Sequence, residues 1–205
     1  RKGRSQITGI AVNDMAVTAR VERKTPNGQA GFSFYTGGSA GDYISEDGQL
    51  TIVMADYKTK RGPWDLDFGF FKGWVGDTQA MNTACSAFGE IACAGTIPKS
   101  ALGLLATVAV HLPELMQKKT IHDVIPYVQY QKVRPNDEKG DGATAAPGKN
   151  YDVVTVGAAY KPHPQVALKA GYRTNYYAGK KASGARPGKQ GTTQSYFELG
   201  VGYQY

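Results

Sequence analysis

Few side chains in this sequence have the types and the spacing that catalysis requires. Asp65 and Asp67 lie two residues apart, so on an extended strand both carboxylates project from the same side. A carboxylate pair can carry out glycoside hydrolysis, but nothing else in the sequence suggests that chemistry. The three histidines, His111, His122 and His163, are scattered, and none has a nucleophile nearby in the sequence. We therefore expect no enzyme, although a triad that assembles only in space would not be visible at this level.

The two cysteines lie close together in the segment CSAFGEIAC, as Cys85 and Cys93. A disulfide between them would close a small loop and would indicate an oxidising compartment such as the periplasm or the cell surface. The alternative is two free thiols. A metal site is disfavoured because no histidine lies nearby and the CxxC spacing is absent. The glycine-rich stretches GGSAGD and GDGATAAPG lack the strand-to-helix context of a phosphate-binding loop, so we expect no cofactor.

The composition excludes one class of membrane protein and leaves another open. Apolar residues make up 41% of the 205 residues, and the mean hydropathy is −0.40. No run approaches the roughly 18 to 20 apolar residues of a membrane-spanning helix. Strands of a membrane β-barrel alternate between apolar and polar residues and average out to polar. The 13 tyrosines and 26 glycines suit the interfacial belts and tight turns of such a barrel.

A period-two alternation of apolar and polar residues recurs along the chain and predicts about nine strands. Many of them are about 9 to 11 residues long, which is enough to cross a bilayer at a tilt, whereas strands of soluble proteins commonly have about 5 or 6. Only PELMQKKT is a candidate for a short helix. The expected strands are 15–23, 29–36, 50–58, 64–74, 100–112, 121–133, 151–161, 166–177 and 195–205.

Each expected strand has one apolar side and one polar side. In the last segment, SYFELGVGYQY, Phe197, Leu199 and Val201 share a side that Glu198 does not. We expect the polar sides to line a water-filled lumen. The alternative is that the charges pair across neighbouring strands, as Arg173 and Glu198 would. The expected lumen residues are Arg20, Glu22, Asp56, Asp65, Asp67, Lys169, Arg173 and Glu198.

Short and long connections alternate along the chain. TPNG, KTKRGP, PELMQKKT and PHPQ are short, and the segments between them are longer and rich in glycine. Outer-membrane barrels have short periplasmic turns and longer external loops. This pattern predicts a strand meander whose long connections all lie outside the cell.

The stretch YFELGVGYQY resembles the aromatic-ended assembly signal of bacterial outer-membrane barrels. IPYVQYQKVRP and YDVVTVGAAYKPHPQVALKAGYR resemble the closing hairpins of proteobacterial porins, especially those similar to the phosphate-selective porin O and P group. The resemblance spans most of the chain through pattern and spacing. It implies an all-β transmembrane antiparallel meander β-barrel of about 16 strands in the outer membrane of a Gram-negative bacterium. It also implies a homotrimer and a C-terminal strand that the barrel assembly machinery reads.

About nine strands is an odd number, whereas bacterial single-chain barrels use even numbers. An open sheet would also leave unpaired backbone groups in lipid, which is prohibitively costly. We therefore expect residues 1–205 to be a single transmembrane β-barrel domain that lacks its N-terminal strands. A further chain or an N-terminal segment would complete the barrel.

The net charge of +7 lies in two segments that both map to the outside. Such a basic mouth would concentrate anions, with a strong dependence on salt, or it would contact anionic lipopolysaccharide. Nucleic-acid binding is disfavoured because the basic residues are not interleaved with stacking aromatics. The basic residues are Arg1, Lys2, Arg4, Lys180, Lys181, Arg186 and Lys189.

The function that the sequence favours is a porin, a passive channel for small hydrophilic solutes with a preference for anions. The main alternative is a non-conducting structural or adhesive barrel that binds a partner through its long external loops. A sheath around another protein and a soluble β-sandwich are further alternatives.

Overall fold

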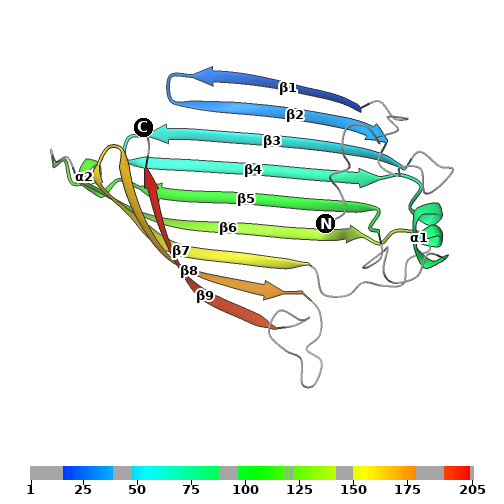
Figure 1. The fold of residues 1–205 in the computed structure, drawn as a ribbon. Helices are drawn as coiled ribbons and strands as arrows, with labels where there is room; N and C mark the ends of the chain where they lie inside the picture. The colour runs from blue at the N-terminus through cyan, green and yellow to red at the C-terminus, as the bar shows by residue number, and fades with distance from the viewer. Residues whose placement is uncertain are drawn as a thin grey trace.

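The computed structural model describes residues 16–38, 48–87, 97–118, 120, 122–141, 150–178 and 192–203. These residues form one nine-stranded sheet in which every strand pairs with its neighbours in the chain. All the pairings are antiparallel. Figure 1 shows the strands side by side in chain order. The expected all-β antiparallel meander is therefore confirmed. The strands are β1 (Ala16–Thr25), β2 (Gly28–Gly38), β3 (Gln49–Arg61), β4 (Trp64–Val75), β5 (Ser100–Val110), β6 (Asp123–Glu138), β7 (Tyr151–His163), β8 (Val166–Tyr177) and β9 (Thr193–Tyr203).

The connections fall into two groups at opposite ends of the sheet (Figure 1). At one end, here called the turn end, residues 26–27, 62–63, 111–122 and 164–165 join the strands. Gly62 occupies the left-handed region with φ of 54°, a conformation that favours glycine in a tight turn. The longer connections lie at the other end, here called the loop end. The alternation of short and long connections in the sequence is thus matched by the topology.

Two short helices interrupt the meander. Helix α2 (Leu112–Leu115) lies in PELMQKKT, where the sequence suggested a short helix. Helix α1 (Thr78–Ala87), at the loop end, was not expected, because its sequence TQAMNTACSA has no clear apolar stripe. It is held by tertiary hydrogen bonds instead. Asn82 Nδ2 donates to the carbonyl oxygens of Ile97 and Asp141, at 3.2 and 3.0 Å, and Asn82 Oδ1 accepts from the Ile97 amide at 2.8 Å.

The sheet has two faces, and the pairing register assigns every strand residue to one of them. Directly opposed residues in an antiparallel pair project to the same face. The apolar face carries Leu66 and Phe68 of β4 and all residues in register with them. The polar face carries Asp65 and Asp67. Thr51, Val53, Ala55 and Tyr57 of β3 lie on the apolar face, as the sequence indicated.

Very little of the sheet is buried. Among the described residues, the only buried hydrophobic side chains are Ile125, Val153 and Ala159. No described element forms a second layer over the apolar face (Figure 1). No helix in the described ranges has the length and apolar character needed to span a membrane. The sheet therefore exposes both faces, and the function of the protein depends on what contacts each of them.

Candidate functional site

The polar face gathers all eight charged residues that the sequence assigned to one side of the strands. The register connects them strand by strand, for example Asp56 opposite Gly69 and Lys58 opposite Asp67. The eight are Arg20, Glu22, Asp56, Asp65, Asp67, Lys169, Arg173 and Glu198.

Arg20 is the centre of an ion-pair network that crosses β1 to β3. Its Nε lies 2.7 Å from Glu22 Oε1, and its Nη1 lies 3.0 Å from Asp56 Oδ1. The same Nη1 donates a hydrogen bond of 2.7 Å to Ser33 Oγ. Gly31 leaves room for this network, because a Cβ there would come within 2.5 Å of Arg20 Nη2 and 2.7 Å of Asp56 Oδ1. Arg20 is therefore neutralised by two carboxylates.

A second group lies on β8 and β9. Arg173 Nη1 lies 3.5 Å from Glu198 Oε1, so the pairing that the sequence allowed for these two residues is present. The Arg173 guanidinium also lies 5.8 Å from the centre of the Tyr196 ring, within the range of a cation–π contact. Arg173 Nε donates a further hydrogen bond of 3.2 Å to Asn175 Oδ1.

Lys169 differs from these paired cations. It projects from the polar face of β8, is exposed, and stands in register between Ala159 and Gly200. Within the described part of the chain it forms no ion pair. Its small register neighbours leave the side chain exposed, so Lys169 is a positive charge on this face without an ion-pair partner among the described residues.

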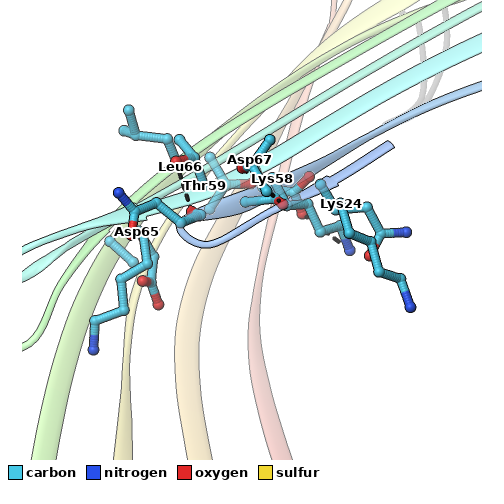
Figure 2. Close-up of a pocket in the computed structure, with 13 residues that line it drawn as sticks. Lys24, Lys58, Thr59, Asp65, Leu66 and Asp67 are labelled. Atoms are coloured by element: carbon cyan, nitrogen blue, oxygen red, sulfur yellow. Dashed lines mark hydrogen bonds and ion pairs between the residues drawn. The ribbon is translucent and has the colours of Figure 1, made fainter. Parts of the chain in front are cut away.

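A cleft of about 650 Å³ lies at the turn end of the polar face. Figure 2 shows Lys24, Lys58, Asp65 and Asp67 at this cleft. Lys58 Nζ and Asp67 Oδ2 are 3.6 Å apart, a loose pair on exposed side chains. The cleft therefore presents both signs of charge to solvent. No group of three or more histidine, cysteine, aspartate or glutamate side chains within the described ranges could hold a metal ion.

His111 lies between two carboxylates near this end of the sheet. Its Nε2 is 2.8 Å from Asp65 Oδ2, and its Nδ1 contacts Asp123 Oδ2. From the sequence, His111 was expected to be scattered from the other histidines with no nucleophile nearby, and this cluster was not predicted. One feature of the sequence could have indicated part of it. Odd-numbered residues of β5 lie on the polar face, so His111, which directly follows β5, is expected on the same face as Asp65. Contacts between residues this far apart in the sequence depend on the register.

The apolar face carries a continuous stripe of side chains, none of them charged. Phe68, Val156, Leu168 and Leu199 have exposed fractions of 46%, 54%, 42% and 77%. We call this set the apolar stripe. It comprises alternate positions in residues 17–21 of β1, 30–34 of β2, 51–57 of β3, 64–70 of β4, 102–110 of β5, 124–130 of β6, 154–160 of β7, 166–172 of β8 and 197–203 of β9.

The apolar stripe crosses the strands obliquely. One register row starts inside the stripe at Val21, Phe32, Ala55, Phe70 and Leu104, and then continues into Lys132, Asp152, Tyr176 and Thr193. On β9 the stripe begins only at Phe197, nearer the turn end. The stripe thus moves toward the turn end from β1 to β9. The displacement is about nine residues over the whole sheet, or about one residue per strand. At about 3.3 Å per residue and about 4.8 Å between strands, this corresponds to strands that are tilted by about 38° from the normal to the stripe.

Aromatic side chains border the stripe at both ends. Trp64, Tyr160 and Tyr203 lie at its turn end. Trp74 and Tyr176 lie just beyond its loop end. All five are exposed side chains with an apolar body and a polar tip, the type that collects at membrane–water interfaces.

Charged residues appear on the apolar face only outside the stripe. At its loop-end margin, Lys72 Nζ lies 2.5 Å from Asp137 Oδ2 and 5.7 Å from the centre of the Trp74 ring. Arg134 Nη2 lies 2.8 Å from Asp152 Oδ1. These paired charges mark a sharp boundary between the apolar stripe and a polar margin.

Two sets of sequence predictions lie outside the described residues. One is the disulfide, because Cys93 and the side chain of Cys85 are not described. The other is the basic mouth, which comprises Arg1, Lys2, Arg4, Lys180, Lys181, Arg186 and Lys189.

Comparison with known proteins gives one relative. The sequence is 26% identical over 176 residues to an uncharacterized protein of Aquifex aeolicus (strain VF5). The match covers 84% of this chain and 40% of that protein, so the chain spans less than half of the relative's length. No family model matches the sequence, and no solved structure matches it.

Proposed function

We propose that this chain forms part of a bacterial outer-membrane porin, with the apolar stripe against hydrocarbon and the polar face against a water-filled lumen. The oblique course of the stripe is the observation that carries the proposal. Strands of transmembrane barrels tilt by about 35 to 45° from the barrel axis, so the normal to a level band of lipid makes that angle with the strands. The tilt of about 38° that follows from the register lies within this range.

The aromatic borders support the same orientation. Outer-membrane barrels have an apolar band about 25 Å tall with aromatic girdles at both interfaces. Trp64 and Tyr160 would lie at the periplasmic interface, and Trp74 and Tyr176 at the external one. The paired charges of Lys72 and Arg134 would then sit in the headgroup layer, where water satisfies them.

The soluble β-sandwich is less consistent with these features. A sandwich covers its apolar face with a second sheet about 10 Å away. Within the described residues nothing covers the stripe, and Leu199 and Val201 have exposed fractions of 77% and 79%. Apolar side chains this exposed, over nine strands, require an apolar solvent or a partner of similar extent.

Closure of the barrel is part of the proposal. β1 and β9 each have one side without a partner strand among the described residues. Unpaired backbone groups are not tolerated in hydrocarbon, so further strands pair with both edges. The longer Aquifex aeolicus relative is compatible with a chain that supplies them. The resemblance to porins extends the proposal to a homotrimer of barrels of about 16 strands, assembled through the last strand.

A lumen lined by both signs of charge suits small hydrophilic solutes. The eight lumen residues comprise three cations and five carboxylates, so the proposed preference for anions rests on Lys169 and on the basic mouth. Arg20 and Arg173 are neutralised by carboxylates, whereas Lys169 has no described partner. An uncompensated lysine on a water-filled wall raises the local concentration of anions and of anionic solutes.

Planar-bilayer recording tests the proposal. The full-length protein, purified in detergent and added to one side of a bilayer, should give discrete steps of ohmic conductance. In a potassium chloride gradient, the reversal potential should have the sign of a chloride preference. A folded, heat-resistant protein that inserts without any conductance would reject the porin and favour a structural or adhesive barrel.

A further inference from the structure

The connection between β5 and β6 is held to the sheet by polar side chains rather than by apolar burial. This segment, residues 111–118, contains α2, and none of the residues of α2 is buried. Leu115 and Met116 have exposed fractions of 49% and 54%. The side-chain contacts that tie the segment down are those of His111 and Glu114. We call residues 111–118 the strap.

Two of these contacts reach neighbouring strands. His111 Nε2 is 2.8 Å from Asp65 Oδ2 at the start of β4. Glu114 Oε2 is 3.1 Å from Lys60 Nζ near the end of β3. A third contact, from His111 Nδ1 to Asp123, ties the strap to the strand that follows it. The strap thus connects β3, β4 and β6 at the turn end.

Lys60 and Asp65 are themselves directly opposed in the register of β3 and β4. Opposed residues have Cβ atoms about 4.5 to 5.5 Å apart, a distance at which lysine and aspartate pair readily. No ion pair joins them in the structure. Each is instead directed to a strap residue, Lys60 to Glu114 and Asp65 to His111. When the strap lifts away, Lys60 and Asp65 can neutralise each other.

We propose that residues 111–118 form a releasable strap, docked by an exchange of partners between the Lys60–Asp65 pair and the strap residues Glu114 and His111. Release allows Lys60 and Asp65 to form an ion pair with each other, and this pair replaces part of the lost docking energy. The free energy of the released state is therefore close to that of the docked state. Release would change a cleft of about 510 Å³ that Lys60, His111, Lys118 and Lys161 line. In the proposed barrel this cleft lies at the periplasmic mouth.

Limited trypsin digestion after Lys118 reports release of the strap. The Lys118 amide donates a hydrogen bond of 2.8 Å to the Pro113 carbonyl oxygen within the strap, so a protease can bind this segment only after the strap has left the sheet and its own turn has opened. When opening is fast, the cleavage rate follows the population of the open state. The assay uses the full-length protein in detergent. Each variant's rate is divided by its own rate after denaturation.

Two variants distinguish an exchange of partners from a simple salt bridge. Each removes the same ion pair, that between Lys60 and Glu114. Glu114→Gln removes the Lys60–Glu114 ion pair and frees Lys60 to pair with Asp65 in place of His111. Both contacts of the strap with β3 and β4 are therefore weakened. Lys60→Met also removes the Lys60–Glu114 contact, but the contact between Asp65 and His111 remains. We expect cleavage to rise about fivefold or more in Glu114→Gln, and by at most half as much in Lys60→Met. Lys58→Met, on the same strand but without a strap contact, should leave the rate unchanged.

Equal rates in Glu114→Gln and Lys60→Met would overturn the exchange, as would a larger effect of Lys60→Met or no effect of either. A matching rise in Lys58→Met would show general loosening of the sheet and would also overturn it. The strap rests on contacts in the structure and not on conduction. Digestion therefore remains decisive if bilayer recordings show no channel.

Discussion

A pair of arginine substitutions in one register row tests the oblique stripe quantitatively. Ala106 on β5 and Ser195 on β9 are small, exposed residues of the apolar face. They belong to the same row, which runs through Tyr130, Val154 and Thr174. If the stripe ran parallel to the register rows, Ala106 and Ser195 would lie at the same depth in the bilayer. Because the stripe is oblique to the rows, the two residues lie at different depths.

The depth difference follows from the tilt. Four strand steps of about 4.8 Å at about 38° displace Ser195 by about 12 Å along the bilayer normal from Ala106. The apolar band is about 25 Å tall, so Ala106 would lie near its middle and Ser195 at its external edge. Arginine on the lipid face costs about 2 to 4 kcal/mol at the midplane and about 0 to 1 kcal/mol near the interfaces.

Equilibrium denaturation in lipid vesicles measures both costs. We expect Ala106→Arg to lower the free energy of unfolding by about 2 to 4 kcal/mol, and Ser195→Arg by about 1 kcal/mol or less. Equal losses at the two positions would refute the tilt. A loss below about 1 kcal/mol at both would refute contact of this face with hydrocarbon, because exposed surface substitutions in water have effects of that size.

Three further substitutions, with Gly103→Ala as a control, address the lumen and the loop end. Lys169→Glu should lower the chloride-to-potassium permeability ratio by about twofold or more, measured as a shift of reversal potential, and an unchanged ratio would exclude Lys169 from the selective wall. Asn82→Ala removes three hydrogen bonds to the partly buried backbone of Ile97 and to Asp141, so amide exchange in α1 should rise by at least about tenfold, corresponding to about 1.4 kcal/mol or more. Gly140→Ala places a methyl group against the Ile97 carbonyl oxygen and should have a similar effect on α1, whereas Gly103→Ala, whose new Cβ meets Phe71 at an ordinary 3.6 Å, should not. Equal effects of the two glycine variants would contradict this packing.

The strands and their faces were predictable because both depend on a period of two. Once each strand is identified, parity assigns its side chains to a face, and a meander has few alternative registers. The Arg173–Glu198 pair was predictable for the same reason, since it joins neighbouring strands at β8 and β9.

The remaining features depend on contacts between distant residues, which the two-residue alternation of apolar and polar side chains does not predict. Helix α1 is stabilised by Asn82 through hydrogen bonds to distant segments, so its own sequence shows no helical stripe. The Asp56 partner of Arg20 lies two strands away, and Gly31 between them makes the approach possible. The His111 cluster brings together residues at the turn ends of the three strands β4, β5 and β6, and only the register places them side by side.

Spin labels along β7 test most directly what covers the apolar stripe. Cysteine variants of residues 154–159 in the full-length protein, labelled and reconstituted in lipid vesicles, alternate between the two faces. If hydrocarbon covers the stripe, labels at Val154, Val156 and Ala158 collide with oxygen and not with a water-soluble nickel chelate, whereas a label at the exposed polar-face position Lys169 of β8 collides with the chelate. Labels at the first three positions that are immobile and shielded from both reagents would reveal a dry protein layer there, and would contradict a lipid-facing sheet.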